Sequence, residues 1–277
     1  MSSISLAEAE KSLYTLWTKR EPREVFLEGN VPQGVNSEYI DGLDPKGINL
    51  YSSLIRTGQN DLMNSIYPGC AGLIGKGFED IIGKYFEHFP AEHHNFNRAA
   101  ERFSLYLEGL GEDNRYVRRY PFLPELADYE WVELEILEHP GKPTRGESIA
   151  LDSPEVFDQY YPVLNSAFVV RRYQYPIAKI VDWLKDGVKL PRRVKKDPVD
   201  LAIYRSLEDN SAKFLELGET ASIIINRAHE VPTSYAELIK LAVESQPDSN
   251  PQQVVVDFLA LVEKLSELEL FVGSKRI

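Results

Sequence analysis

Residues 201–217 read LAIYRSLEDNSAKFLEL. Two runs of strand-forming residues, 201–207 and 212–217, flank the turn-forming tripeptide Glu208-Asp209-Asn210. Short β-prone runs on either side of such a turn are typical of an antiparallel hairpin. The sequence therefore predicts a small antiparallel sheet in the C-terminal half of the chain.

Three helices are predicted after this hairpin. The first covers about residues 220–229, and the second follows Ser234, which forms a capping-box pattern with Glu237. The third follows Asn250, with Pro251 at its first position, and the apolar residues 270–272 predict a short terminal strand. A hairpin followed by three helices is the order of a winged-helix-type module.

The N-terminal half has the periodicity of a helical bundle. A capping box of Ser5 and Glu8 opens the first predicted helix, and apolar residues spaced three and four apart indicate further helices over residues 50–66, 78–86, 96–107 and 123–138. Residues 29–47 contain too many glycines and prolines to predict regular structure there.

A segment dense in helix breakers, residues 139–146, marks the predicted domain boundary. After it, residues 165–175 predict a strand and residues 177–184 a short helix. The expected fold is α+β: an all-α helical domain over residues 1–140, then a winged-helix-like domain with a small antiparallel sheet over residues 145–277.

Composition limits the functional classes. Hydrophobic residues make up 43% of the 277 residues and charged residues 27%, which is typical of a folded globular chain. The single cysteine, Cys70, excludes an intramolecular disulfide framework and is expected to be a buried, inert thiol. No secretory signal pattern and no run of about 18 apolar residues occurs, so we expect a cytoplasmic protein that does not bind membranes.

No motif for an independent catalytic site is present. The sequence lacks a Gly-x-Ser-x-Gly elbow, a phosphate-binding loop and a His-Glu-x-x-His helix. His88, His93 and His94 could suggest a metal site, but adjacent histidines cannot place both rings on one side of a helix, and the surrounding residues predict a solvated loop. We therefore predict no enzyme activity, no metal and no cofactor.

Several stretches of the chain resemble the HvfC/BufC N-terminal-domain family. They are residues 49–55 (NLYSSLI), 66–75 (IYPGCAGLIG), Phe78, Tyr85, Phe89-Pro90, Phe103 with Leu107, and 124–131 (PELADYEW). The similarity continues at Tyr175-Pro176, Trp183 and residues 201–205. The resemblance implies a non-catalytic partner subunit, similar to MbnC, of a TIM-barrel multinuclear-iron enzyme that modifies cysteine-containing ribosomal peptides, as in methanobactin or bufferin biosynthesis.

The C-terminal module is also similar to the PqqD-type peptide-recognition element. In that element a leader peptide adds as a strand beside the hairpin and packs against the third helix, so that main-chain hydrogen bonds give affinity and adjacent pockets give specificity. The peptide-binding residues expected from this resemblance lie on the second hairpin strand and on the third helix: Lys213, Phe214, Leu215, Leu217, Val255, Leu259 and Val262.

A DNA-binding regulator is the alternative interpretation. Its candidate contacts form the concentrated basic segment Lys189, Arg192, Arg193, Lys195 and Lys196. The net charge of the chain is −12, and residues 198–277 contain seven Lys or Arg against thirteen Asp or Glu. Because phosphate neutralisation supplies most non-specific DNA affinity, this charge disfavours nucleic acid as the partner.

Overall fold

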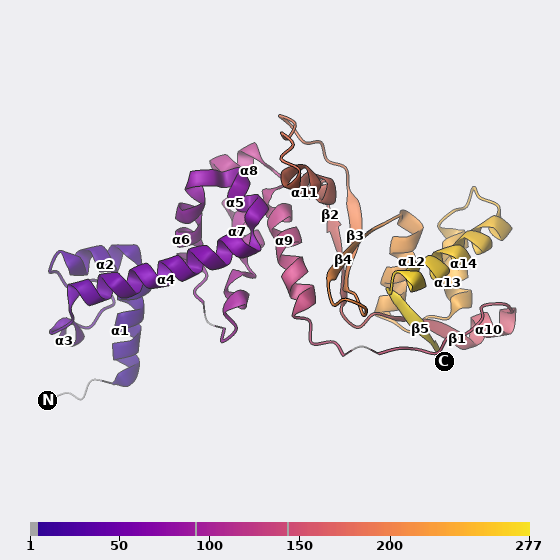
Figure 1. The fold of residues 1–277 in the computed structure, drawn as a ribbon, viewed down its shortest axis with the longest axis horizontal. Helices are drawn as coiled ribbons and strands as arrows, with labels where there is room; N and C mark the ends of the chain where they lie inside the picture. Colours follow the sequence, from indigo (N-terminus) through magenta and orange to yellow (C-terminus); the bar gives the residue numbers. More distant parts are fainter. Residues whose placement is uncertain (1–4, 92, 143) are drawn as a thin grey trace. The chain divides into compact units, whose positions relative to one another are not determined.

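The protein has an α+β fold that divides into two compact units, residues 1–131 (unit 1) and 132–277 (unit 2) (Figure 1). The structure is a computed structural model and describes residues 5–91, 93–142 and 144–277. The division lies within helix α9 (Leu123–Leu137), N-terminal to the segment 139–146 in which the sequence predicts a domain boundary.

All regular structure described in unit 1 is helical, as the periodicity predicted. Before α9 the α-helices are α1 (Leu6–Thr18), α2 (Arg20–Leu27), α3 (Ser37–Ile40), α4 (Pro45–Ile66), α5 (Pro68–Ile74), α6 (Phe78–His88), α7 (Phe103–Leu110) and α8 (Arg115–Arg119). Short 3-10 turns occur at Gly75–Gly77, Phe96–Ala100 and Gly111–Asp113.

The helix start at Ser5 is confirmed, because its hydroxyl accepts from Glu8 N while the Glu8 carboxylate accepts from the Ser5 main chain. The expectation of irregular structure over residues 29–47 was wrong in part. Helix α3 lies within it, and α4 begins at Pro45 because the Asp44 carboxylate accepts from Lys46 N. The helix predicted over residues 96–107 is also divided into a 3-10 turn and α7.

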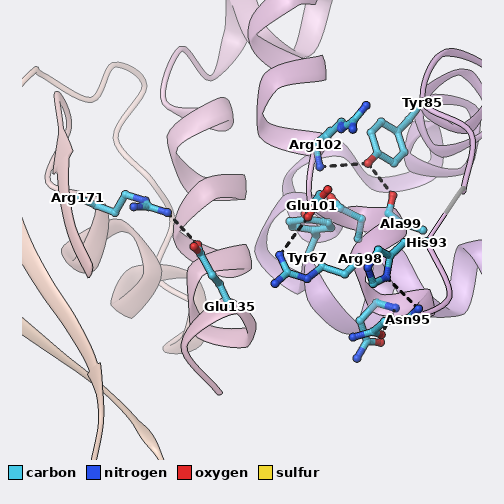
Figure 2. A network of polar contacts seen from close by, with 12 residues as sticks. Tyr67, Tyr85, His93, Asn95, Arg98, Ala99, Glu101, Arg102, Glu135 and Arg171 are labelled. Atoms are coloured by element: carbon cyan, nitrogen blue, oxygen red, sulfur yellow. Dashed lines mark hydrogen bonds and ion pairs between the residues drawn. The ribbon is translucent and has the colours of Figure 1, made fainter. Parts of the chain in front are cut away.

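Tyrosine and phenylalanine rings form the centre of unit 1. Tyr67, Tyr85 and Phe103 are fully buried and pack ring against ring. The two tyrosine hydroxyls donate to main-chain carbonyls, Tyr67 to Ala100 at 2.6 Å and Tyr85 to Ala99 at 2.7 Å. Figure 2 shows the bond between Tyr85 and Ala99. These bonds satisfy polar groups that would otherwise destabilise a buried core.

Unit 2 contains the predicted hairpin and the three helices that follow it. Its elements after α9 are α10 (Pro154–Gln159), β1 (Tyr160–Leu164), β2 (Phe168–Tyr173), α11 (Ile177–Lys185), β3 (Val199–Arg205), β4 (Ala212–Leu217), α12 (Glu219–Glu230), α13 (Tyr235–Glu244), α14 (Pro251–Glu267) and β5 (Phe271–Arg276). The described strands form two antiparallel sheets, one in the order β2-β3-β4 and one that pairs β1 with β5.

Both faces of the three-stranded sheet are covered. On one face, Phe168, Ala202 and Leu217 belong to a buried cluster shared with α12, α13 and α14. On the other face, Leu201 and Ile203 are 1% and 0% exposed. Since side chains alternate between the faces of a strand, the Ala202↔Leu215 register places Leu215 and Leu217 toward the three helices.

No helix in the described part of the chain is both long enough and apolar enough to cross a membrane.

Candidate functional site

Strand β4, which contains the predicted peptide-binding edge, is one of the two outer strands of its sheet. It pairs with β3 along one side, and no strand among the described residues pairs with its other side. A long outer strand carries a row of main-chain groups that can pair with another extended chain.

Two main-chain hydrogen bonds show which residues of β3 bond to β2 and which bond to β4. Arg205 N donates to Ala167 O at 3.0 Å, next to β2, and Ser206 N donates to Ser211 O at 2.9 Å, next to β4. Bonded and non-bonded pairs alternate in an antiparallel ladder. Odd-numbered residues of β3 therefore bond to β2, and even-numbered residues bond to β4.

The same alternation orients β4. Ala202 opposes Leu215 and Tyr204 opposes Lys213, so the odd-numbered residues of β4 direct their main chain toward β3. Ala212 and Glu216 then direct their N–H and C=O groups away from β3. An incoming strand would exchange its first main-chain hydrogen bonds with these residues.

The side chains of β4 provide different chemical groups along this edge. Lys213 is exposed and forms an ion pair with Asp209 at 2.9 Å, while Phe214 and Leu215 are half-buried. Leu217 is buried. The four predicted β4 residues therefore range from a solvated cation near the turn to an apolar side chain where α12 begins.

A groove of about 800 Å³ adjoins the α12 end of β4. Within it, the Asp200 carboxylate lies 3.5 Å from the Arg172 guanidinium and accepts from the Ser222 hydroxyl at 2.8 Å. Glu216 and Leu217 form part of the wall. The other lining residues come from β2, from β3 and the residue before it, and from α12: Val170, Arg172, Pro198, Val199, Asp200, Glu219, Ser222, Ile223 and Asn226. The groove could hold side chains of a bound strand, and it presents both signs of charge.

The structure places the predicted α14 residues elsewhere. Leu259 and Val262 line a separate groove of about 830 Å³ beside β5, and Val255 is half-buried and lines neither groove. The sequence-predicted site is thus divided between two sheet edges.

The basic segment forms an exposed connector between α11 and β3. Lys189, Arg192, Arg193, Lys195 and Lys196 all lie on it with exposed side chains. The single cation of α14, Lys264, lies 3.5 Å from Glu267.

The three histidines near the end of α6 contact neighbouring rings and main chain. His93 and His94 stack with ring centroids 4.2 Å apart, and the His93 Nδ1 accepts from Asn95 N at 3.0 Å. His88 packs edge-on against Phe89. Across the described residues, no group of three or more His, Cys, Asp and Glu side chains is arranged to hold a metal ion.

Cys70 is fully buried at the start of α5, as the sequence predicted. The Glu130 carboxylate accepts from the main-chain N–H groups of Gly69 and Cys70. Burial raises the pKa of the Cys70 thiol well above its ordinary value, and the Glu130 charge raises it further. The neutral thiol is therefore a poor nucleophile.

The sequence did not predict that β1 pairs with β5, or that a segment between α9 and α10 lies against β5. The residue types at positions 145–149 do not predict a strand. Glu147, within this segment, pairs with Ser274, which is far away in the sequence. No protein-family model matches this chain, and no curated protein matches it.

Proposed function

We propose that the protein is a non-catalytic partner subunit that binds an extended precursor peptide by strand addition at β4. The observation that carries the proposal is that β4 is an outer strand whose even-numbered residues Ala212 and Glu216 turn their main chain away from β3. A peptide that pairs there gains affinity from main-chain hydrogen bonds, whatever its sequence.

Specificity would come from the groove at the α12 end of β4. Its Arg172 and Asp200 can interact with charged or polar peptide side chains, and Ile223 and Leu217 with apolar ones. In this proposal the hairpin and its three helices act as a winged-helix-like module that adds a peptide beside the hairpin, as the PqqD-type element does, but the helix beside the peptide is α12 and not α14.

The resemblance to the HvfC/BufC family supports the second half of the proposal. It implies that a TIM-barrel multinuclear-iron enzyme modifies the bound peptide, and that the helical unit 1 supplies part of the docking surface for this enzyme in the cytoplasm. The chemistry then belongs to the enzyme, and the present chain supplies recognition.

A matched pair of variants at one position tests the β4 site. Proline at position 216 removes an outward N–H without removing a bond to β3, and outer strands tolerate proline. Threonine at the same position keeps the N–H. Fluorescence anisotropy should show micromolar binding of a labelled, cysteine-bearing precursor peptide encoded beside the gene, at least tenfold weaker for Glu216→Pro than for Glu216→Thr.

Two results would contradict the proposal. One is that neither the precursor peptide nor the purified neighbouring iron enzyme binds at micromolar concentration. The other is that Glu216→Pro, with an unchanged circular dichroism spectrum, binds the peptide as well as Glu216→Thr does.

A DNA-binding function is favoured by one observation, the exposure of five cations on the connector between α11 and β3. It predicts salt-sensitive binding to duplex DNA that is lost in the double variant Arg192→Glu and Arg193→Glu. A gel shift that is absent, or that this variant leaves unchanged, removes the DNA-binding function.

A further inference from the structure

Residues 145–151, here called the strap, lie along the side of β5 that β1 does not occupy. Gly146 N donates to Val272 O at 2.9 Å, and Glu147 N donates to Ser274 O at 2.7 Å. Ser274 N donates back to Glu147 O at 2.9 Å. The strap is thus paired with β5 as an added strand would be, although it forms only this short ladder.

Two glycines allow this close approach. A Cβ on Gly146 would lie 2.5 Å from Ser274 N, and a Cβ on Gly273 would lie 2.6 Å from the carbonyl carbon of Gly146. Gly273 also has a φ of +115°, which side chains rarely adopt. Glycine is therefore required on both sides of the contact.

The apolar side chains of the strap point toward the helices. Ile149 and Leu151 pack against the buried cluster that includes Phe258 and Val262 of α14. The strap does not fill the space beside it: a groove of about 830 Å³ remains, with Leu259 and Val262 in its α14 wall.

From this arrangement we infer that the groove between β5 and α14 is a second binding site for an extended peptide. In the structure described here the strap occupies part of this site. The strap defines the ligand class: an extended segment with a glycine at the β5 contact and apolar residues three and five positions after it. A segment with larger apolar side chains would also fill the groove that Ile149 and Leu151 leave open. The site differs from the proposed β4 site, because it belongs to the other sheet and to the third helix.

Competition between the strap and a free peptide tests the inference. The probe is a fluorescein-labelled synthetic peptide with the sequence of residues 144–152, TRGESIALD. In the full chain, Gly146→Val should clash with the Ser274 main chain and release the strap, and the variant should bind the probe at least tenfold more tightly than the unaltered protein. Ala150→Val is the matched control on the same strap, because residue 150 is exposed. It should not increase binding.

A second variant allows the test to be made even if Gly146→Val does not fold. Ile149→Ser combined with Leu151→Ser removes the apolar anchors and leaves β5 and α14 unchanged, and it should also increase probe binding. Hydrogen exchange at the Glu147 and Ser274 amides reports release of the strap. Faster exchange without increased probe binding overturns the inference, as does unchanged exchange in both variants. Since Glu216→Pro should not affect the probe, failure here is distinguishable from failure of the β4 proposal.

Discussion

The guanidinium of Arg171 on β2 lies 2.8 Å from the carboxylate of Glu135 in the last turn of α9 (Figure 2). The two side chains are 31% and 27% exposed, so the pair is partly shielded from solvent. Within unit 2 this contact fixes the end of α9 on the sheet whose opposite edge is β4.

Glu135→Gln should therefore lower the free energy of unfolding by about 1 kcal/mol, the upper range for such ion pairs. Urea denaturation at low and high salt measures the effect, which should shrink as salt screens the pair. Glu133→Gln, an exposed position on the same helix, is the control and should have no measurable effect. Equal losses for the two variants would show that the ion pair does not stabilise the fold.

Arg205 should be sensitive to replacement by lysine. Its guanidinium donates to three main-chain oxygens at the end of α9 and in the segment after it: Leu137 O at 3.0 Å, His139 O at 3.1 Å and Gly141 O at 3.0 Å. An ammonium group cannot reach all three in the same geometry. We expect Arg205→Lys to lower the free energy of unfolding by about 1–3 kcal/mol.

Arg172→Lys is the control for this variant, because Arg172 is 67% exposed and makes one longer contact with Asp200. Chemical denaturation should show almost no change for it. If Arg205→Lys is equally harmless, the three carbonyls are satisfied by water instead.

Asp209 should make the stability of the hairpin depend on pH. Its carboxylate accepts from the Ser211 hydroxyl and from the Lys213 ammonium, and both hold its pKa well below the ordinary value of 3.8. A carboxyl group whose pKa is lower in the folded state than in the unfolded state stabilises the fold at pH values above its unfolded-state pKa. This stabilisation is lost as the pH falls through the folded-state pKa. Asp209→Asn should lower the melting temperature at pH 7, and the difference from the parent should shrink only below about pH 4.

Thermal melts from pH 7 to pH 3 measure this difference. Glu208→Gln, in the same turn, is the control and should show no such pH dependence. If the difference in melting temperature between Asp209→Asn and the parent is the same at pH 3 as at pH 7, the Asp209 carboxylate does not have this role.

Cys70 should resist alkylation in the folded protein. The thiol is inaccessible and its raised pKa keeps it neutral at pH 8. Mass spectrometry after iodoacetamide treatment should find no adduct on the native chain and complete modification in guanidinium chloride. Rapid modification without denaturant would show that the start of α5 opens in solution.

Local signals predicted much of the fold. Capping residues such as Ser5, Ser234 and Asn250 define helix starts because they satisfy N–H groups within the next turn, a requirement independent of tertiary context. The start of α4 at Asp44 and Pro45 carried the same kind of signal, which the surrounding glycines obscured.

Long-range pairing could not be predicted in this way. The bridge between Glu147 and Ser274 joins segments whose sequences contain no complementary pattern, and it depends on a close main-chain approach. For the candidate site, the sequence predicted strand β4 but could not show whether α14 would lie beside β4 or beside β5. That choice depends on how α14 packs against β5 and α13, and those contacts form only in the folded chain.

The register of β3 and β4 has a consequence for variation in the loop that joins them. Side chains change faces with every residue, so a strand shifted by one position would turn Leu215 and Leu217 away from the helices and bring Glu216 into the apolar cluster. The length of the loop 206–211 therefore fixes which residues of β3 and β4 pair with each other. Natural or engineered variants should accept single-residue insertions in the exposed connector 186–198 far more readily than in this loop.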